Sequence, residues 1–289
     1  MSKEEKIKEF TRILFRWHKK NYRPMQWRNT HDPYRILVSE IMLQQTQVDR
    51  VRTKYAKFLK KFPTVRVLAS ATLGDVLRAW SGLGYNRRAK YLHECAKKVV
   101  SLHEGRFPKD SITLISLPGI GISTSAALMA FAFNQDEPMI DTNIRRILTR
   151  VFFTPTMSRS DLDMVKPSDK VLYAFAKELI PKGKGREWNY AMLDLGATLC
   201  TARNHSDDCP LSTLHGNVSD FVYKKPQKKF EHSNRYYRGR ILSVLTEHSA
   251  TQKELCRLLS ITEARLLPLV TKLIAEKLVI SKGKSFRLP

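Results

Sequence analysis

Cysteine and long apolar runs are both scarce in this sequence of 289 residues. Its 4 cysteines, Cys95, Cys200, Cys209 and Cys256, are too few and too scattered for a disulfide scaffold. No stretch of about 18 apolar residues occurs, so we predict that no segment spans a membrane and that a membrane is not a partner. The N-terminal residues contain no apolar signal core, and we therefore expect a cytoplasmic protein.

Acidic residues are scarce relative to basic ones. The chain has 27 Asp and Glu against 51 Lys and Arg, which gives a formal net charge of +24. Such an excess repels itself in a compact chain and attracts polyanions. Because 42% of the residues are hydrophobic, the chain is predicted to be globular rather than disordered. We therefore predict nucleic acid as the partner, which in a prokaryote associates the protein with the nucleoid.

Alternation of apolar and polar residues is almost absent as well. Apolar residues recur instead at three- and four-residue steps, as at Val48, Val51 and Tyr55, which predicts a mainly α-helical protein. The length suits two domains. Residues 223–235 are polar, basic and without periodicity, and predict a linker between a domain at 1–222 and another at 236–289.

The residues after this linker predict three helices and a β-hairpin. The helical patterns cover Tyr237–His248, Gln252–Leu259 and Glu263–Lys277, and the hairpin covers 278–288. This order is similar to a small winged helix-turn-helix, an α+β domain. Its third helix, with Lys282 and Lys284 on the hairpin, is expected to contact DNA. Winged helices also serve as protein-contact modules, and that alternative stays open.

A second pattern predicts a helical hairpin at about 112–133. Two helical stretches meet at a turn with two glycines, whose bare backbone amides can bind a phosphate. The pattern is typical of a helix-hairpin-helix, a clamp that binds duplex DNA without sequence preference. We expect contacts to double-stranded DNA at four residues, Leu117, Gly119, Gly121 and Ser123. The alternative is an ordinary turn between helices.

Two carboxylates are candidates for chemistry. Asp141 stands where a helix begins, in the segment Pro138–Ile147, so a helix cap is the simpler interpretation. Glu40 is flanked by apolar residues such as Val38 and Ile41. Burial there would raise the pKa of the Glu40 carboxyl and suit it to give a proton at neutral pH. The alternative is a glutamate on a helix surface.

The segment Ser39–Val48 carries a specific resemblance. Together with Asp32–Tyr34, Gly82–Tyr85 and the hairpin, it resembles the adenine DNA glycosylases of the MutY family, within the helix-hairpin-helix superfamily. The resemblance covers roughly residues 10–212. It implies a two-lobed helix-hairpin-helix glycosylase fold, to which the winged-helix-like domain is added.

The resemblance also implies a catalytic set. Glu40 matches the general acid that protonates N7 of adenine, and Asp141 matches the carboxylate that stabilises the oxocarbenium-like sugar. Asn143 matches an asparagine beside the reacting centre, which would orient Glu40 or a water. The implied activity is hydrolysis of the N-glycosidic bond of adenine mispaired with guanine or oxidised guanine, as a step of base excision repair.

Four more residues have implied roles at the DNA. Tyr85 matches an aromatic wedge that enters the duplex near the opposite base, and Gln45 matches a probe on the same side. Trp27 and Arg28 match a pair near the pocket that receives the extruded base. The implied partner is therefore duplex DNA with mismatched or oxidised base pairs, bound by a monomer.

Ser123 occupies a position that separates branches of the superfamily. The endonuclease III branch has a lysine there, whose amine attacks the sugar and leads to strand cleavage. Because a hydroxyl cannot form an imine, we predict a monofunctional glycosylase with little or no lyase activity. A glycosylase for T·G mismatches on the same scaffold stays an alternative, as does a DNA-binding protein without catalysis.

The sequence departs from the family at the iron–sulfur ligands, which follow a C-x6-C-x2-C-x5-C spacing. Cys200 stands in the first ligand place, but the other three fall on Asp207, Pro210 and Gly216. Four thiolates are required, so we predict no iron–sulfur cluster. A zinc site at Cys200, His205, Cys209 and His215 is disfavoured by its unusual spacing, and we predict no metal and no cofactor.

A second departure is at the C-terminus. Family members recognise oxidised guanine with a further domain, and about sixty residues are too few for it. The preferred opposite base and the role of the C-terminal domain are not decided by the sequence.

Overall fold

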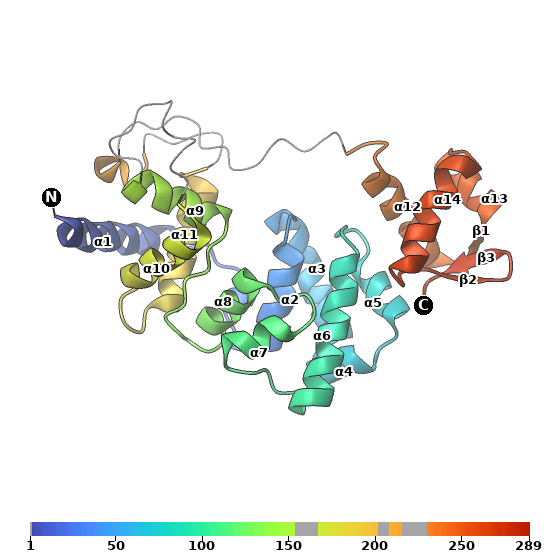
Figure 1. Ribbon diagram of the computed structural model, residues 1–289, viewed down its shortest axis with the longest axis horizontal. Helices are drawn as coiled ribbons and strands as arrows, with labels where there is room; N and C mark the ends of the chain where they lie inside the picture. The colour runs from blue at the N-terminus through green and yellow to red at the C-terminus, as the bar shows by residue number, and fades with distance from the viewer. Residues whose placement is uncertain (1, 154–166, 202–207, 216–229) are drawn as a thin grey trace. The chain divides into compact units, whose positions relative to one another are not determined.

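The computed structural model of the chain describes residues 2–153, 167–201, 208–215 and 230–289 (Figure 1). Helices dominate these residues, which confirms the predicted fold class. The chain folds into two compact units, each built from segments that are separate in sequence. Unit 1 comprises Met1–Ile36, Lys109–Ser111 and Gly121–Lys225, and unit 2 comprises Leu37–Pro108, Ile112–Ile120 and Pro226–Pro289.

Unit 1 is a bundle around a core that includes Trp188 and Phe10, both fully buried. Helix α11 packs against both α1 and α9, and α10 packs against α9. Its helical segments are α1 Lys3–Asn21, η1 Gln26–Arg28, α8 Ile122–Phe131, α9 Thr142–Leu148, η2 Thr149–Phe153, α10 Asp169–Leu179, α11 Gly185–Thr198 and η3 Ser212–Leu214. Ser2 begins α1 with a reciprocal capping box to Glu5, which satisfies backbone donors that the first helical turn leaves open.

Unit 2 starts with helices that pack around Phe58 and Trp80, whose rings meet edge to face. Its first helices are α3 Val48–Lys61, α4 Val65–Ser70, α5 Leu73–Trp80 and α6 Arg87–His103. Thr64 and Thr72 cap the short helices α4 and α5 with their hydroxyls. Two helices, α2 Pro33–Leu43 and α7 Ser111–Ser116, begin in unit 1 and end in unit 2.

The C-terminal part of unit 2 has the predicted winged-helix arrangement (Figure 1). Its elements are α12 Asn234–Glu247, β1 Ala250–Thr251, α13 Gln252–Leu259, α14 Glu263–Ala275, β2 Ile280–Lys282 and β3 Ser285–Arg287. The strands form an antiparallel sheet of order β1-β3-β2, and Lys282 pairs with Ser285 across the hairpin turn.

Helix boundaries in this domain differ from the prediction. Helix α14 ends at Ala275, two residues before the expected Lys277. Helix α12 begins at Asn234, three residues before the expected Tyr237, because the Ser233 hydroxyl caps it by accepting from the Tyr236 amide. Of the predicted linker, residues 223–229 lie outside the described residues.

The C-terminal domain is attached to α5 and α6 by contacts to its backbone. The Gly74 amide donates to the Pro289 carbonyl at 2.9 Å, and Lys90 Nζ donates to the Glu276 carbonyl at 2.9 Å. Arg78 Nε adds a longer bond of 3.3 Å to the carbonyl of Thr246. Within the described residues, no helix is both long and apolar enough to cross a bilayer.

Candidate active site

The turn between α7 and α8 contains the predicted DNA-binding glycines. Gly119 has φ +79°, and a Cβ there would lie 2.8 Å from Tyr91 Cβ, so both the backbone and the packing require glycine. Gly121, by contrast, has open space around it and precedes α8 directly. The Leu117 side chain is buried, and therefore only its main chain can make the predicted phosphate contact.

Asp141 is the N-cap of α9 in unit 1. Its Oδ1 accepts hydrogen bonds from the amides of Asn143 and Ile144, each at 2.8 Å. Its Oδ2 accepts from Nδ2 of Asn143 at 3.1 Å. Burial raises the pKa of the Asp141 carboxyl, and these hydrogen bonds, with the charge of Arg146, offset part of that rise. Asp141 is thus the helix cap that the simpler interpretation predicted, and the same side chain remains the predicted catalytic carboxylate.

Arg146 holds the side chain of Asn143 by a hydrogen bond to its amide oxygen. The sequence did not predict this role. Arg146 Nη2 donates to Asn143 Oδ1 and to the Gly196 carbonyl, both at 2.8 Å, and its Nε donates to the Cys200 carbonyl at 2.7 Å. A Cβ at Gly196 would lie 2.5 Å from Asn143 Cβ, so α11 must have glycine at this contact. The one signal for this contact in the sequence is the spacing of three residues between Asn143 and Arg146, which places both on the same face of a helix.

Ser123 belongs to unit 1, like Asp141, and lies close to it. It is exposed in the first turn of α8, and its Oγ donates at 3.2 Å to the carbonyl of Ile140, the residue before Asp141. Unit 1 therefore brings together three predicted residues: Ser123, Asp141 and Asn143.

Glu40 is in unit 2, near the end of α2. Its side chain is half-buried, and the residues around it in sequence, from Leu37 to Met42, are otherwise buried. The apolar surroundings expected from the sequence are present. The pairing of Glu40 with Asp141 stays a prediction.

Gln45, the predicted probe, and Tyr85, the predicted wedge, both adopt left-handed backbone conformations, with φ of 55° and 45°. Such angles are unfavourable for residues other than glycine and need support from neighbours. The support comes from one buried guanidinium, that of Arg88. Its Nη1 donates to the carbonyls of Ile41, Met42 and Gln44, and its Nη2 donates to those of Leu83 and Gly84 and to the hydroxyl of Thr46.

Arg88 thus connects the turn that contains Gln45 to the turn that contains Tyr85. Burial lowers the pKa of Arg88 to about 10, which still leaves it charged at pH 7. The sequence reasoning missed this residue because a buried arginine has no sequence pattern that separates it from the other basic residues.

Arg28 is buried and makes a bidentate ion pair with Asp194, at 2.7 and 2.8 Å. Burial alone would raise the pKa of Asp194, but hydrogen bonds from His18 and Arg28 outweigh it and hold that pKa below its usual value. The guanidinium also lies over the rings of Tyr190, at 4.4 Å, and Tyr22, at 5.4 Å. The Arg28 side chain is therefore held by an ion pair and by two aromatic rings.

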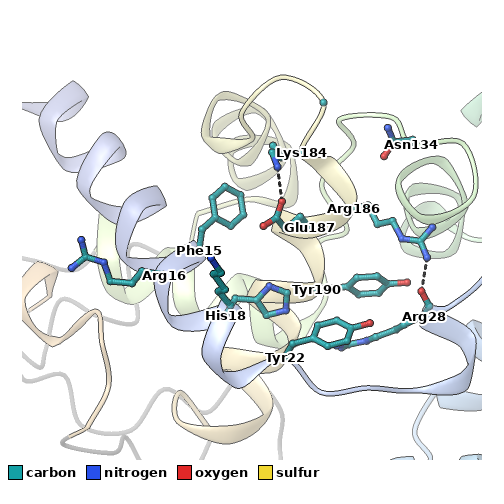
Figure 2. A pocket seen from close by; sticks show the side chains of 12 residues that line it. Phe15, Arg16, His18, Tyr22, Arg28, Asn134, Lys184, Arg186, Glu187 and Tyr190 are labelled. Carbon is teal, nitrogen blue, oxygen red and sulfur yellow. Dashed lines mark hydrogen bonds and ion pairs between the residues drawn. The ribbon is translucent and has the colours of Figure 1, made fainter.

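A pocket of about 880 Å³ in unit 1 has Arg28 in its wall (Figure 2). Figure 2 shows the ring of Tyr190 next to Arg28, with Arg186 donating to the Arg28 carbonyl at 2.6 Å. Trp27, the neighbour of Arg28, is buried, with 4% of its surface exposed, and does not line this pocket. The assignment of both residues to a base pocket stays a prediction.

The cysteines do not fit a four-thiolate iron–sulfur cluster. Cys200 and Cys209 are both buried in the core of unit 1, and Arg150 Nη1 donates to Cys200 Sγ at 3.0 Å. Burial raises the pKa of Cys209 to about 11, so that this thiol is protonated at pH 7. Cys95 and Cys256 belong to unit 2.

The zinc alternative is only partly covered by the structure. His205 lies outside the described residues, and those residues contain no group of three or more side chains suited to hold a metal ion. The absence of a cofactor stays a prediction.

Lys282 and Lys284 are exposed on the β2–β3 hairpin, as the sequence predicted. Their contact with DNA stays a prediction.

Comparison with known proteins now defines the class. Residues 38–165 match the family described as "HhH-GPD superfamily base excision DNA repair protein". The adenine DNA glycosylase of Mycolicibacterium smegmatis is 37% identical over 243 residues, which are 81% of this chain and 79% of that protein. A thermostable thymine-DNA glycosylase of known structure is 29% identical with a TM-score of 0.68, covering 74% of this chain and 97% of that one. An endonuclease III in a trapped DNA complex shares the fold at 19% identity and a TM-score of 0.63, covering 74% of this chain and 96% of that one.

The similarity to the mycobacterial enzyme, together with the family match, makes the chain a helix-hairpin-helix DNA N-glycosylase of base excision repair. Within that superfamily, the chain belongs to the adenine DNA glycosylase family, which confirms the resemblance found in the sequence.

Proposed function

We propose that this protein removes adenine from duplex DNA in which adenine is mispaired with guanine or oxidised guanine, by hydrolysis of the N-glycosidic bond. The observation that carries the proposal is the Asp141 carboxylate, which is half-buried at the start of α9 and hydrogen-bonded by Asn143. A fixed anion with little hydration stabilises a cationic sugar more strongly than a solvated one does.

The reaction divides between two carboxyl groups. Glu40 gives its proton to N7 of adenine, the bond between C1′ and N9 breaks, and the bonding electrons leave with the neutral base. Asp141 stabilises the oxocarbenium-like sugar, and water adds to C1′ while its proton goes to the Glu40 carboxylate. Asn143 is fixed by Asp141 and Arg146, and it orients Glu40 or the water.

Duplex binding uses separate groups. Backbone amides at Leu117, Gly119 and Gly121 bind phosphates, and Tyr85 and Gln45 fill the space left by the extruded adenine. Lys282 and Lys284 add contacts to the backbone of the duplex. The protein acts as a monomer, in the cytoplasm and on the nucleoid of a prokaryotic cell.

Ser123 supports a monofunctional reaction. Its hydroxyl lies where other members have the amine that forms a Schiff base, and it hydrogen-bonds near Asp141. The wild-type product should therefore be an abasic strand that stays intact until alkali is added. Ser123→Lys places an amine at the same position, and borohydride should then trap a covalent complex with the DNA.

Single-turnover assays on duplexes with A opposite oxidised guanine, A opposite guanine and T opposite guanine test the substrate. We expect adenine release from the first two, and a loss of about 10³-fold in Glu40→Gln and Asp141→Asn while duplex binding survives. Unchanged activity in both variants contradicts the catalytic assignment.

The similarity to the thymine-DNA glycosylase favours a second candidate, removal of thymine from T·G mismatches. The same assay separates the two, because thymine release without adenine release replaces the first proposal with the second. Duplex binding with no base release leaves a DNA-binding protein without catalysis.

A further inference from the structure

The aromatic side chains of the C-terminal domain gather at α12 and just before it, and Arg265 of α14 lies over one of their rings, that of Tyr237, at 5.7 Å. The Tyr236 ring contacts that of Phe230 on one side, at 5.6 Å between centroids, and that of Tyr237 at 5.2 Å. Guanidinium groups lie over these rings, Arg235 over Phe230 at 5.0 Å and Arg240 over Tyr236 at 5.7 Å. Arginines on aromatic rings are typical of surfaces that bind nucleic acid.

Helix α14, the predicted DNA-reading helix, has a different surface. Its exposed side includes two large apolar residues, Leu267 at 44% and Ile274 at 37% exposure. Its only basic residues are Arg265 and Lys272. Such a surface is less suited to phosphates than that of α12.

Arg235 joins the α12 cluster to Tyr85. Its Nη1 donates to the Tyr85 hydroxyl at 2.6 Å, and its guanidinium lies 5.4 Å from the centre of the Tyr85 ring. Tyr85 is thus contacted by two arginines, Arg88 on one element and Arg235 on another. The side chain of the predicted wedge is thus in contact with the C-terminal domain.

A groove of about 330 Å³ lies in unit 2 beside this contact. Its wall includes Gly82, Gly84 and Asn86 from the loop around Tyr85, and Tyr236 and Arg240 from α12. Arg50 of α3 is also part of the wall, so two guanidinium groups line the groove, and none of its described lining residues is acidic. Glycines leave backbone amides accessible to a phosphate.

We propose that this groove binds the DNA strand opposite the one that carries the adenine. Arg240 and Arg50 contact its phosphates, and Arg235 sets the Tyr85 ring against the base opposite the adenine. Arg235 is thus a positioning residue for opposite-base selectivity, and α12 binds DNA in addition to the lysines of the β2–β3 hairpin. The inference rests on the proposed function, because it assigns Tyr85 to the duplex.

Binding of the full-length protein to a duplex with a stable abasic analogue opposite guanine or oxidised guanine tests the groove. Arg240→Ala should weaken binding about tenfold and reduce the dependence of log K on log salt by about one. Arg257→Ala is the matched control, since Arg257 is exposed on α13 of the same domain and outside the groove, and its binding should equal that of the wild type. Unchanged binding and salt dependence in Arg240→Ala overturn the proposal.

The positioning role needs a second measurement. Arg235→Ala and Tyr85→Phe each remove the hydrogen bond between the two side chains, and Tyr85→Phe keeps the ring. Both should change the ratio of binding to the oxidised-guanine and guanine duplexes in the same direction, and the double variant should add little. A ratio equal to that of the wild type in both variants contradicts the assignment of Arg235.

These outcomes are independent of adenine release. If the wild type releases no adenine but Arg240→Ala weakens binding as described, the proposed function fails and the groove remains. If adenine is released and only Lys282→Ala weakens duplex binding, the function remains and the groove assignment is wrong.

Discussion

Asp141 shows how a single residue can meet a structural and a chemical requirement together. As an N-cap it accepts hydrogen bonds from two amides of α9, and in the proposed reaction its half-buried carboxylate stabilises the cationic sugar. Asparagine caps helices about as well as aspartate. Asp141→Asn therefore removes the charge and keeps the cap.

The pH dependence of Asp141→Asn follows from the raised pKa. Between the unfolded pKa of about 3.9 and the higher folded pKa, the folded protein binds more protons than the unfolded one, so its stability falls as pH rises. Asp141→Asn lacks this loss. The free energy of unfolding of the variant, minus that of the wild type, should therefore increase as the pH rises from acid to 7. At pH 7 the variant should be the more stable of the two proteins.

Urea unfolding of both proteins across this pH range measures the difference. A variant that is less stable than the wild type at pH 7 contradicts the expected sign. In the wild type, adenine release should fall as acid protonates Asp141, whose pKa burial raises above that of an ordinary aspartate.

Arg88 is the second residue with a specific prediction. Arg88→Ala leaves several buried carbonyls without a donor and should lower the free energy of unfolding by about 3 kcal/mol. The turns of Gln45 and Tyr85 lose their support as well, so adenine release should fall even where the variant is fully folded. Arg87→Ala is the control, because Arg87 is exposed and its guanidinium donates to the Tyr91 hydroxyl at the surface; its stability should change by less than about 0.5 kcal/mol.

At the scale of elements, the helix-hairpin-helix turn has two glycines with different requirements. Gly119→Ala places a Cβ against Tyr91 in a left-handed conformation, which should cost about 1 to 2 kcal/mol and weaken duplex binding. Gly121→Ala meets no neighbour and has a negative φ, so its stability should fall less. Urea unfolding and duplex binding of both variants measure the two effects. An equal loss of stability in the two variants contradicts the stricter requirement for glycine at position 119.

The elements themselves were largely predictable. The turn at Gly119, the start of α9 at Asp141 and the β2–β3 hairpin follow from local signals, namely glycines, a capping residue and a change of periodicity. The start of α12 was missed because Tyr236 continues no apolar pattern, and Ser233 decides the boundary. Local rules locate elements well when a cap or a turn residue is present.

The supports of the site were not predictable in the same way. Arg88 and Arg146 act through carbonyls that are more than forty residues away in the chain, as with Ile41 and Cys200. Such contacts follow from tertiary packing and not from any spacing in the sequence. The sequence identified the groups expected to react, and the structure added the groups that orient them.

At the scale of the whole molecule, the placement of the C-terminal domain was the least predictable feature. The chain returns to unit 2 at Pro226, and the domain is bound to α5 by a backbone hydrogen bond that needs glycine. A Cβ at Gly74 would lie 2.5 Å from the Pro289 carbonyl oxygen. Since the contact is between backbones, neither residue type indicates it in advance.

Gly74→Ala tests this attachment because two effects on stability oppose each other. Alanine inside a helix is better than glycine by about 1 kcal/mol, which favours the variant, while the clash with Pro289 disfavours it. In the full-length protein the clash should win, with a lower melting temperature or a separate transition for the C-terminal domain. In a chain that ends at Leu288 the same substitution should stabilise, because the clashing carbonyl is gone. Calorimetry on the four proteins of this cycle measures the coupling, and a stabilising effect of Gly74→Ala in both backgrounds shows that the domain does not dock on α5 in solution.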